Sequence, residues 1–177
     1  MTRKVVSAFV AIVVLILSFT GCSGDIKSET PVMLEQVNTE GRYAARGYLE
    51  SILTGDREMF NKCYPEGFVD DLNAASGVDV FDEYAKATRI NGVILGTASV
   101  GATDYTVDNG FDEAHMRARI CSVMGFEYSE VGRIQVQVVR AFFKNDSESV
   151  NTDFHFVVFE KGGSWYMFES LRSEAGY

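Results

Sequence analysis

The stretch that decides the fold is FHFVVFEKGGSWYMF, residues 154–168. On both sides of Gly162 and Gly163, apolar residues occupy the even-numbered and the odd-numbered positions alike, and most of them are β-branched or aromatic. Such runs are typical of β-strands, and two adjacent glycines allow the positive φ angles of a tight hairpin turn. The stretch therefore predicts two antiparallel strands joined by a two-residue turn, with Trp165 buried in the second strand.

Another strand is predicted immediately before this hairpin. Residues 134–142 alternate apolar side chains along one face, interrupted by Arg140, and residues 144–149 read as a polar turn. Because both faces of these strands carry apolar residues, one face should meet helices. The other face needs a ligand, a partner or more of the chain itself, and a homodimer formed through the sheet face is one such arrangement.

Apolar positions at three- and four-residue steps predict helices in the first two thirds of the chain. The longest runs from Pro31, which suits a first helical turn, to about Leu53. Residues 54–56, Thr-Gly-Asp, end it and cap the next helix. The other predicted helices span residues 59–63, 68–72, 81–88 after a cap at Asp79, and 111–121 between a start at residues 108–110 and an end at Gly125.

Residues 93–105 change the pattern, because small and β-branched residues replace the helical spacing and Gly96 and Gly101 interrupt it. They predict a curved or bulged strand, or two short strands. The order of elements is then helices, a strand, a helix and three antiparallel strands. This order predicts an α+β fold in which a long N-terminal helix and short helices pack on a curved antiparallel sheet.

The N-terminal stretch has the features of a secretory signal. A basic start at residues 3–4 precedes an uncharged apolar run over residues 5–19, and small residues precede Cys22. Residues 19–22, FTGC, resemble the lipobox of bacterial lipoproteins, with Phe19 where that family prefers leucine. The resemblance implies a diacylglyceryl group on Cys22, cleavage before it, and a lipid anchor on the extracytoplasmic side of the cell membrane of a Gram-positive bacterium.

Two alternatives apply to this stretch, a membrane-spanning helix and an ordinary secretory signal with a chance cysteine; the order small–Gly–Cys–Ser at the end of the run disfavours the second. A helix of that length rises roughly 22 Å, against a hydrocarbon core of about 30 Å, so the run suits a signal better than a span. The predicted organisation is a signal peptide over residues 1–21, a tether over residues 22–31 and one α+β domain over residues 32–177. Fully extended, the tether reaches about 30 Å, which would keep the domain close to the membrane.

Charge narrows the classes of partner. Without Arg3 and Lys4, 14 basic residues stand against 25 acidic ones, a net charge of −11, and no basic cluster occurs. Nucleic-acid binding is therefore disfavoured, because contacts to phosphates need clustered Lys and Arg. An acidic domain also gains nothing from an anionic membrane surface, so the lipid on Cys22 would supply the attachment.

The order of elements resembles that of the NTF2-like, or cystatin-like, α+β domains of many small exported Gram-positive lipoproteins. The resemblance lies in YLESILTGD at residues 48–56, in the helix near Phe111, and in VVFEKGGSWY at residues 157–166. It implies a cone-shaped domain with a pocket between sheet and helix. Members include isomerases, dehydratases and non-catalytic binding domains, and no member's catalytic residues can be matched to this chain.

The candidates for lining such a pocket are Arg140, His155, Trp165 and Tyr84. Arg140 would bind an anionic ligand through its fork-shaped guanidinium, or else reach water at the strand's open end. His155 is the candidate for acid–base chemistry, because histidine titrates near neutrality, or else a hydrogen-bonded strand residue. Tyr84 and Trp165 fit a core equally well. No cofactor and no metal site are predicted, because the only other histidine, His115, lies in a distant element.

Two cysteines remain besides Cys22. An exported protein could join Cys63 and Cys121 in a disulfide. Neither cysteine lies in a metal-binding spacing, and both fit buried positions as small apolar residues. The sequence favours two unpaired thiols.

The function expected from these patterns is that of a membrane-anchored, non-enzymatic domain that binds a small ligand or another protein of the cell envelope. A small hydrolase, isomerase or dehydratase that uses His155 with a nearby carboxylate is the alternative. The two differ in one structural requirement, because an enzyme of this kind needs His155 and the carboxylate to converge in a closed pocket.

Overall fold

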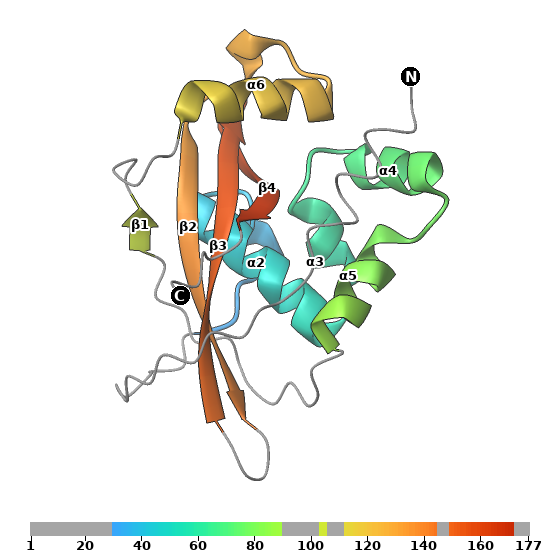
Figure 1. Cartoon of the computed structure of the whole chain (residues 1–177), viewed down its shortest axis with the longest axis vertical. Helices are drawn as coiled ribbons and strands as arrows, with labels where there is room; N and C mark the ends of the chain where they lie inside the picture. Colours follow the sequence, from blue (N-terminus) through green and yellow to red (C-terminus); the bar gives the residue numbers. More distant parts are fainter. Residues whose placement is uncertain (1–29, 90–102, 106–111, 145–148, 172–177) are drawn as a thin grey trace, which may run out of the picture.

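The computed structural model describes residues 30–89, 103–105, 112–144 and 149–171, and shows helices packed on an antiparallel sheet (Figure 1). The predicted α+β class is confirmed. The elements, in chain order, are η1 (Leu34–Gln36), α2 (Gly41–Thr54), α3 (Arg57–Lys62), α4 (Phe68–Ser76), α5 (Val80–Arg89), β1 (Thr103–Tyr105), α6 (Glu113–Met124), η2 (Tyr128–Glu130), β2 (Ile134–Lys144), β3 (Ser149–Lys161) and β4 (Ser164–Leu171).

The sheet has the strand order β1-β2-β3-β4, and every neighbouring pair is antiparallel. β2, β3 and β4 are long, whereas β1 contributes only Thr103–Tyr105, opposite residues 136–138 of β2. These three residues are the described part of the strand predicted over residues 93–105. The predicted turn at residues 144–149 lies mostly outside the described residues.

The hairpin between β3 and β4 has the predicted two-residue turn. Lys161 pairs with Ser164, and the two turn residues, Gly162 and Gly163, have φ angles of 61° and 83°. Positive φ at both central residues matches the right-handed twist of the flanking strands, and glycine adopts it without steric cost. The turn sets the register that places Trp165 opposite Glu160.

Helices cover one face of the sheet and one end of the other. Val158, Trp165 and Met167 face α2 and pack in one core with the residues of α3 and α5. Val157 and Phe159 face the other way and pack against α6. Figure 1 shows α6 lying across one end of β2 and β3, with α3, α4 and α5 grouped beside α2. The sequence predicts that the second apolar face of the sheet needs a cover, and α6 of the chain itself covers part of that face.

A β-bulge in β4 fixes how α6 sits. Val158 pairs with Met167 but Val157 pairs with Glu169, so Phe168 is the extra residue on β4. Phe168 packs in the core beneath α6, and Glu169 accepts two hydrogen bonds of 2.7 Å from the guanidinium of Arg119 on that helix. The bulge thus turns two neighbouring side chains toward α6, which strict alternation along the strand would not do.

The first helix begins later than the sequence predicts. The chain forms η1 and a turn after Pro31, and α2 begins at Gly41. The reason is Asn38, whose carbonyl accepts a hydrogen bond of 2.9 Å from the Trp165 N–H and whose Nδ2 donates to the Trp165 carbonyl at 2.8 Å. Residue 38 therefore pairs with the edge of β4, and a continuous helix from residue 31 could not make this contact.

A buried ion pair on α2 binds the backbone of residues 30–32, which precede η1. The Arg46 guanidinium lies 2.9 Å from the Glu50 carboxylate, and both side chains are almost fully buried. Glu50 also accepts the Val32 N–H at 2.8 Å, and Arg46 donates to the Thr30 carbonyl at 2.9 Å. These bonds satisfy charges that would be costly to bury alone, and they attach residues 30–32 to the domain.

The helix boundaries elsewhere follow the predicted caps. Gly55 has a φ of 83° after α2, and Asp56 accepts the Met59 N–H at 3.0 Å at the start of α3. Asp79 accepts the Asp82 N–H at 3.0 Å at the start of α5. Gly125 ends α6 as predicted, but that helix starts at its own cap Asp112. The start predicted at residues 108–110, together with Phe111, lies outside the described residues.

Replacing Trp165 tests the register of the hairpin. Trp165→Ala should lower the free energy of unfolding by about 3–5 kcal/mol, because it removes a large side chain that is only 5% exposed. The midpoint of urea unfolding measures the effect. His155→Ala, at a half-buried position on β3, is the control and should leave the domain folded. A Trp165→Ala midpoint equal to that of the parent would contradict the burial of this side chain.

Candidate functional site

The structure does not bring the four sequence-predicted pocket residues together. Trp165 lies in the core beneath α2, and Tyr84 on α5 packs there against Tyr48, with ring centroids 6.3 Å apart. His155 lies at a position on the opposite side of the sheet, where it pairs in register with Val138. Arg140 pairs in register with Asp153, and its side chain lies outside what the structure describes. The sheet therefore separates the two aromatic candidates from the histidine.

Among the described residues, aromatic rings pack against one another between α2 and the sheet, where the NTF2-like resemblance implies a pocket. The ring of Tyr48 lies 5.4 Å from that of Phe156 on β3 and 5.7 Å from that of Phe60 on α3, measured between centroids. Burial raises the pKa of Tyr48, Tyr64 and Tyr84, so all three stay protonated at neutral pH. These side chains serve as packing groups rather than as acids or bases.

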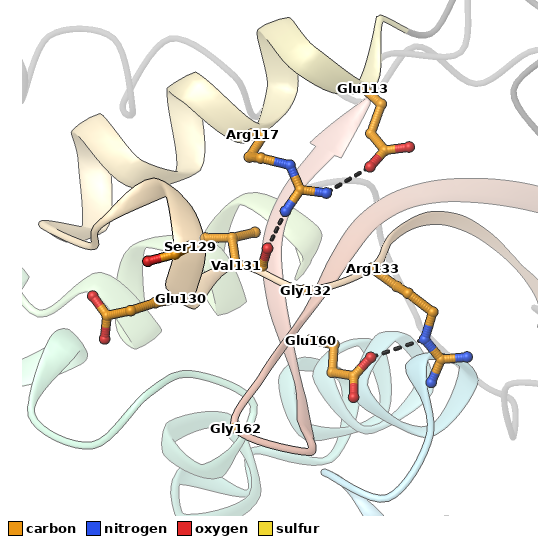
Figure 2. Close-up of a pocket in the computed structure, with 9 residues that line it drawn as sticks. All are labelled: Glu113, Arg117, Ser129, Glu130, Val131, Gly132, Arg133, Glu160 and Gly162. Atoms are coloured by element: carbon orange, nitrogen blue, oxygen red, sulfur yellow. Dashed lines mark hydrogen bonds and ion pairs between the residues drawn. The ribbon is translucent and has the colours of Figure 1, made fainter.

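A hollow of about 570 Å³ opens on the surface at the end of the sheet, among α6, η2 and the turn between β3 and β4 (Figure 2). Charged side chains and exposed backbone make up most of its lining. The lining residues are Glu113, Arg117, Ser129, Glu130, Val131, Gly132, Arg133, Glu160 and Gly162.

Backbone hydrogen bonds hold the floor of the hollow. The Gly132 N–H donates to the Glu160 carbonyl at 2.7 Å, and the Glu160 N–H donates to the Arg133 carbonyl at 2.8 Å, which continues the pairing of β2 with β3. The two chains approach so closely that a Cβ on Gly132 would lie 3.2 Å from the Glu160 carbonyl oxygen. The guanidinium of Arg117 donates to the Val131 carbonyl and ties α6 to this floor.

Three cations around the hollow share one arrangement, in which each is held by a carboxylate and lies over an aromatic ring. The nitrogen–oxygen distances lie between 2.6 and 3.0 Å, and the cation-to-ring distances between 4.5 and 5.4 Å. The three sets are Arg117 with Glu113 and Tyr128, Arg133 with Glu160 and Trp165, and Lys161 with Glu130 and Phe126.

This arrangement limits the motion of the charged groups and balances their charge. Glu130 shows the effect on titration, because the backbone N–H of Glu127, together with Lys161, holds the pKa of the Glu130 carboxyl below its ordinary value. The three sets together carry no net charge, in a chain whose formal net charge is −9. The charged side chains that line the hollow itself are three glutamates and two arginines, so the hollow presents charges of both signs with a net charge of −1.

Among the described residues that line the hollow, Ser129 carries the only hydroxyl side chain, and none is a histidine or a cysteine. Within the part of the chain that the structure describes, no group of three or more His, Cys, Asp or Glu side chains could hold a metal ion.

Sequence patterns did not indicate these residues. The sequence separates Arg117 from Arg133 and Glu160 by 16 and 43 positions, and no spacing motif links them. They share no local signal either, since the ring over which Arg117 lies, Tyr128, is 11 positions away in the sequence.

Comparison of the chain with protein families, with curated proteins and with solved structures finds no match in any of the three. The features of the hollow are therefore read from this chain alone.

The two thiols lie on opposite sides of the sheet. Cys63 packs in the core beneath α2, Cys121 lies on α6, and both are free. The prediction that they are unpaired is confirmed. Burial raises the pKa of the Cys63 thiol, and the charges of Asp56 and Glu50 raise it further.

Alkylation should distinguish the two thiols. At about pH 8.5 iodoacetamide should leave Cys63 unmodified in the native protein, because its raised pKa and its burial keep the reactive thiolate scarce and inaccessible. In urea both Cys63 and Cys121 should react, which provides the control. Peptide mass spectrometry measures the modification. Rapid native alkylation of Cys63, or an intact mass two hydrogens lower without reductant, would contradict the structure.

Proposed function

We propose that the chain is a lipoprotein, anchored through a diacylglyceryl group on Cys22 to the extracytoplasmic side of a cell membrane. The pattern of a basic start, an uncharged apolar run and a small-residue end at residues 3–22 supports this proposal. Residues 30–32 are bonded to α2, so the tether between anchor and domain would be residues 23–29. Two acyl chains provide a stable attachment that the acidic domain itself could not.

In the described residues, none of the helices is long and apolar enough to cross a membrane.

The anchored domain acts as a non-enzymatic binding module in this proposal, with the hollow beside α6 as its binding site. The observation that carries the proposal is the packing of the domain. Among the described residues, aromatic rings of α2, α3, α5 and β3 pack against one another between α2 and the sheet, whereas the surface hollow presents charged groups that pair with carboxylates and lie over rings. Groups that are already ordered lose little conformational entropy when a ligand binds.

The order of elements, with helices packed on an antiparallel sheet, also supports an NTF2-like assignment of the domain. Within that assignment, the separation of His155 from Tyr84 and Trp165 by the sheet favours a binding domain over an isomerase or a dehydratase.

Substitution of the anchor cysteine tests the proposal. Cys22→Ser should abolish the incorporation of an alkyne-labelled fatty acid and leave the protein either unprocessed or released from the membrane, because serine offers no thiol for the diacylglyceryl transfer. Ser23→Ala is the matched control and should keep the label. Metabolic labelling in a bacterial host, followed by membrane fractionation, measures both. A Cys22→Ser protein that is processed, labelled and membrane-bound like the parent would overturn the lipoprotein proposal.

A further inference from the structure

Met33 is an exposed apolar side chain close to the start of the described domain. Its exposed fraction is 57%, and only two other large apolar side chains among the described residues are exposed, Tyr128 at 56% and Val78 at 44%. Pro31 is exposed as well. Residues 30–39 contain a single charged residue, Glu35. Because single exposed apolar residues are common on protein surfaces, the place of Met33 in the chain decides what it can do.

The backbone on either side of Met33 is held in one conformation. The Met33 N–H donates to the Gln36 Oε1 at 3.1 Å, and the Met33 carbonyl accepts the Gln36 N–H at 2.9 Å. Val32 and Val37 are buried in the core, and the Glu50 carboxylate accepts the Val32 N–H at 2.8 Å. The exposed side chain is therefore carried by an ordered segment, so a contact that buries it costs little backbone entropy.

The proposed anchor precedes this segment by a short length of chain. Seven residues, 23–29, separate Cys22 from Thr30, and a chain of seven residues reaches at most about 25 Å. The Thr30 carbonyl is in turn bonded to Arg46 on α2 at 2.9 Å. Residues 30–33 are thus the part of the described domain that follows the anchor most closely. A short connection raises the effective concentration of this segment at the membrane, so even a weak contact is populated.

The small size of the exposed apolar surface favours a lipid partner over a protein partner. A specific protein interface buries at least about 1,200 Å² and needs a matching shape. An apolar side chain enters the boundary between the headgroups and the acyl chains of a bilayer without a matching surface. The charge of Glu35 would stay in water, and like the acidic domain it disfavours an anionic bilayer. The segment therefore fits an electrically neutral lipid surface best.

We propose that Met33, together with Pro31, inserts into the surface of the membrane to which Cys22 anchors the chain, so that this side of the domain faces the lipid. The inference rests on the proposed lipid anchor and adds a second point of attachment. An anchor alone leaves the domain able to turn on its tether, whereas two points of attachment restrict its orientation.

Quenching of a fluorescent label by lipids tests the inference. The full lipidated chain is placed in phosphatidylcholine vesicles, with Met33→Cys labelled by an NBD dye in a Cys121→Ser background. Cys22 is blocked by its lipid, and Cys63 is buried. Phosphatidylcholine with a doxyl group near its headgroup should lower the emission of this label by about twofold or more, because doxyl groups quench only at close range and the label would lie among the lipids.

The same dye at the two other exposed apolar positions provides the matched controls. Val78→Cys and Tyr128→Cys, labelled in the same background, carry an equally apolar dye on equally exposed positions. Their emission should change little with the doxyl lipid, because neither position follows the anchor in the chain. The controls therefore separate a contact made by residue 33 from a tendency of the dye itself to enter the bilayer.

Energy transfer from Trp165, the single tryptophan, gives a readout on the chain without an attached dye. Asn38, five residues after Met33, is hydrogen-bonded to Trp165, so this tryptophan lies near the segment. In phosphatidylcholine vesicles that contain a dansyl lipid, Met33→Glu should lower the transfer by about half, because a charged side chain does not insert and the domain moves away. Val78→Glu adds the same charge at another exposed apolar position and should leave the transfer unchanged.

Two outcomes would overturn the inference alone, in a chain that floats with the vesicles in a density gradient: equal quenching at residues 33, 78 and 128, or equal energy transfer in the Met33→Glu and parent chains. A chain that carries no lipid and does not float with the vesicles would overturn the lipoprotein proposal, and the inference with it. Flotation therefore distinguishes the two failures.

Discussion

The pair of hydrogen bonds between Asn38 and the backbone of Trp165 is the contact on which the rest of the fold depends. Asn38 bonds both the N–H and the carbonyl of Trp165, and the Met167 N–H donates to the Cys63 carbonyl at 2.7 Å. These bonds close the outer edge of β4 over this stretch, where unpaired groups would otherwise invite another strand. They also bring the start of α2 onto the sheet, where a Cβ on Gly41 would lie only 3.0 Å from the Trp165 ring and from Val158.

The hairpin of β3 and β4 also shapes the face of the sheet that packs against α6. Its bulge presents Phe168 and Glu169 together to α6, and Arg119 holds Glu169 in a nearly buried position. α6 is thereby held across one end of the sheet, and the hollow forms where this helix, η2 and the hairpin turn meet. The candidate site is thus a product of how the elements are assembled, and no single element carries it.

The chemistry of the hollow follows from the same assembly. An exposed ion pair usually contributes little, because both side chains lose entropy and water screens the charges. Here an aromatic ring beneath each cation restricts its motion further, and Arg117 is additionally bonded to the backbone of Val131.

The sequence by itself determined the α+β class, the glycine turn between β3 and β4, the burial of Trp165, and the caps at Asp56 and Asp79, because each depends on residues a few positions apart. The N-terminal lipobox pattern is local in the same way, and it stays a prediction. Only the tertiary structure decided that α2 begins at Gly41, because the contact responsible joins residues 127 positions apart. It also placed His155 and Trp165 on opposite faces of the sheet and brought Arg117, Arg133 and Glu160 together. Side-chain alternation and helical spacing describe an element's own faces, and the contacts between elements depend on how those faces pack.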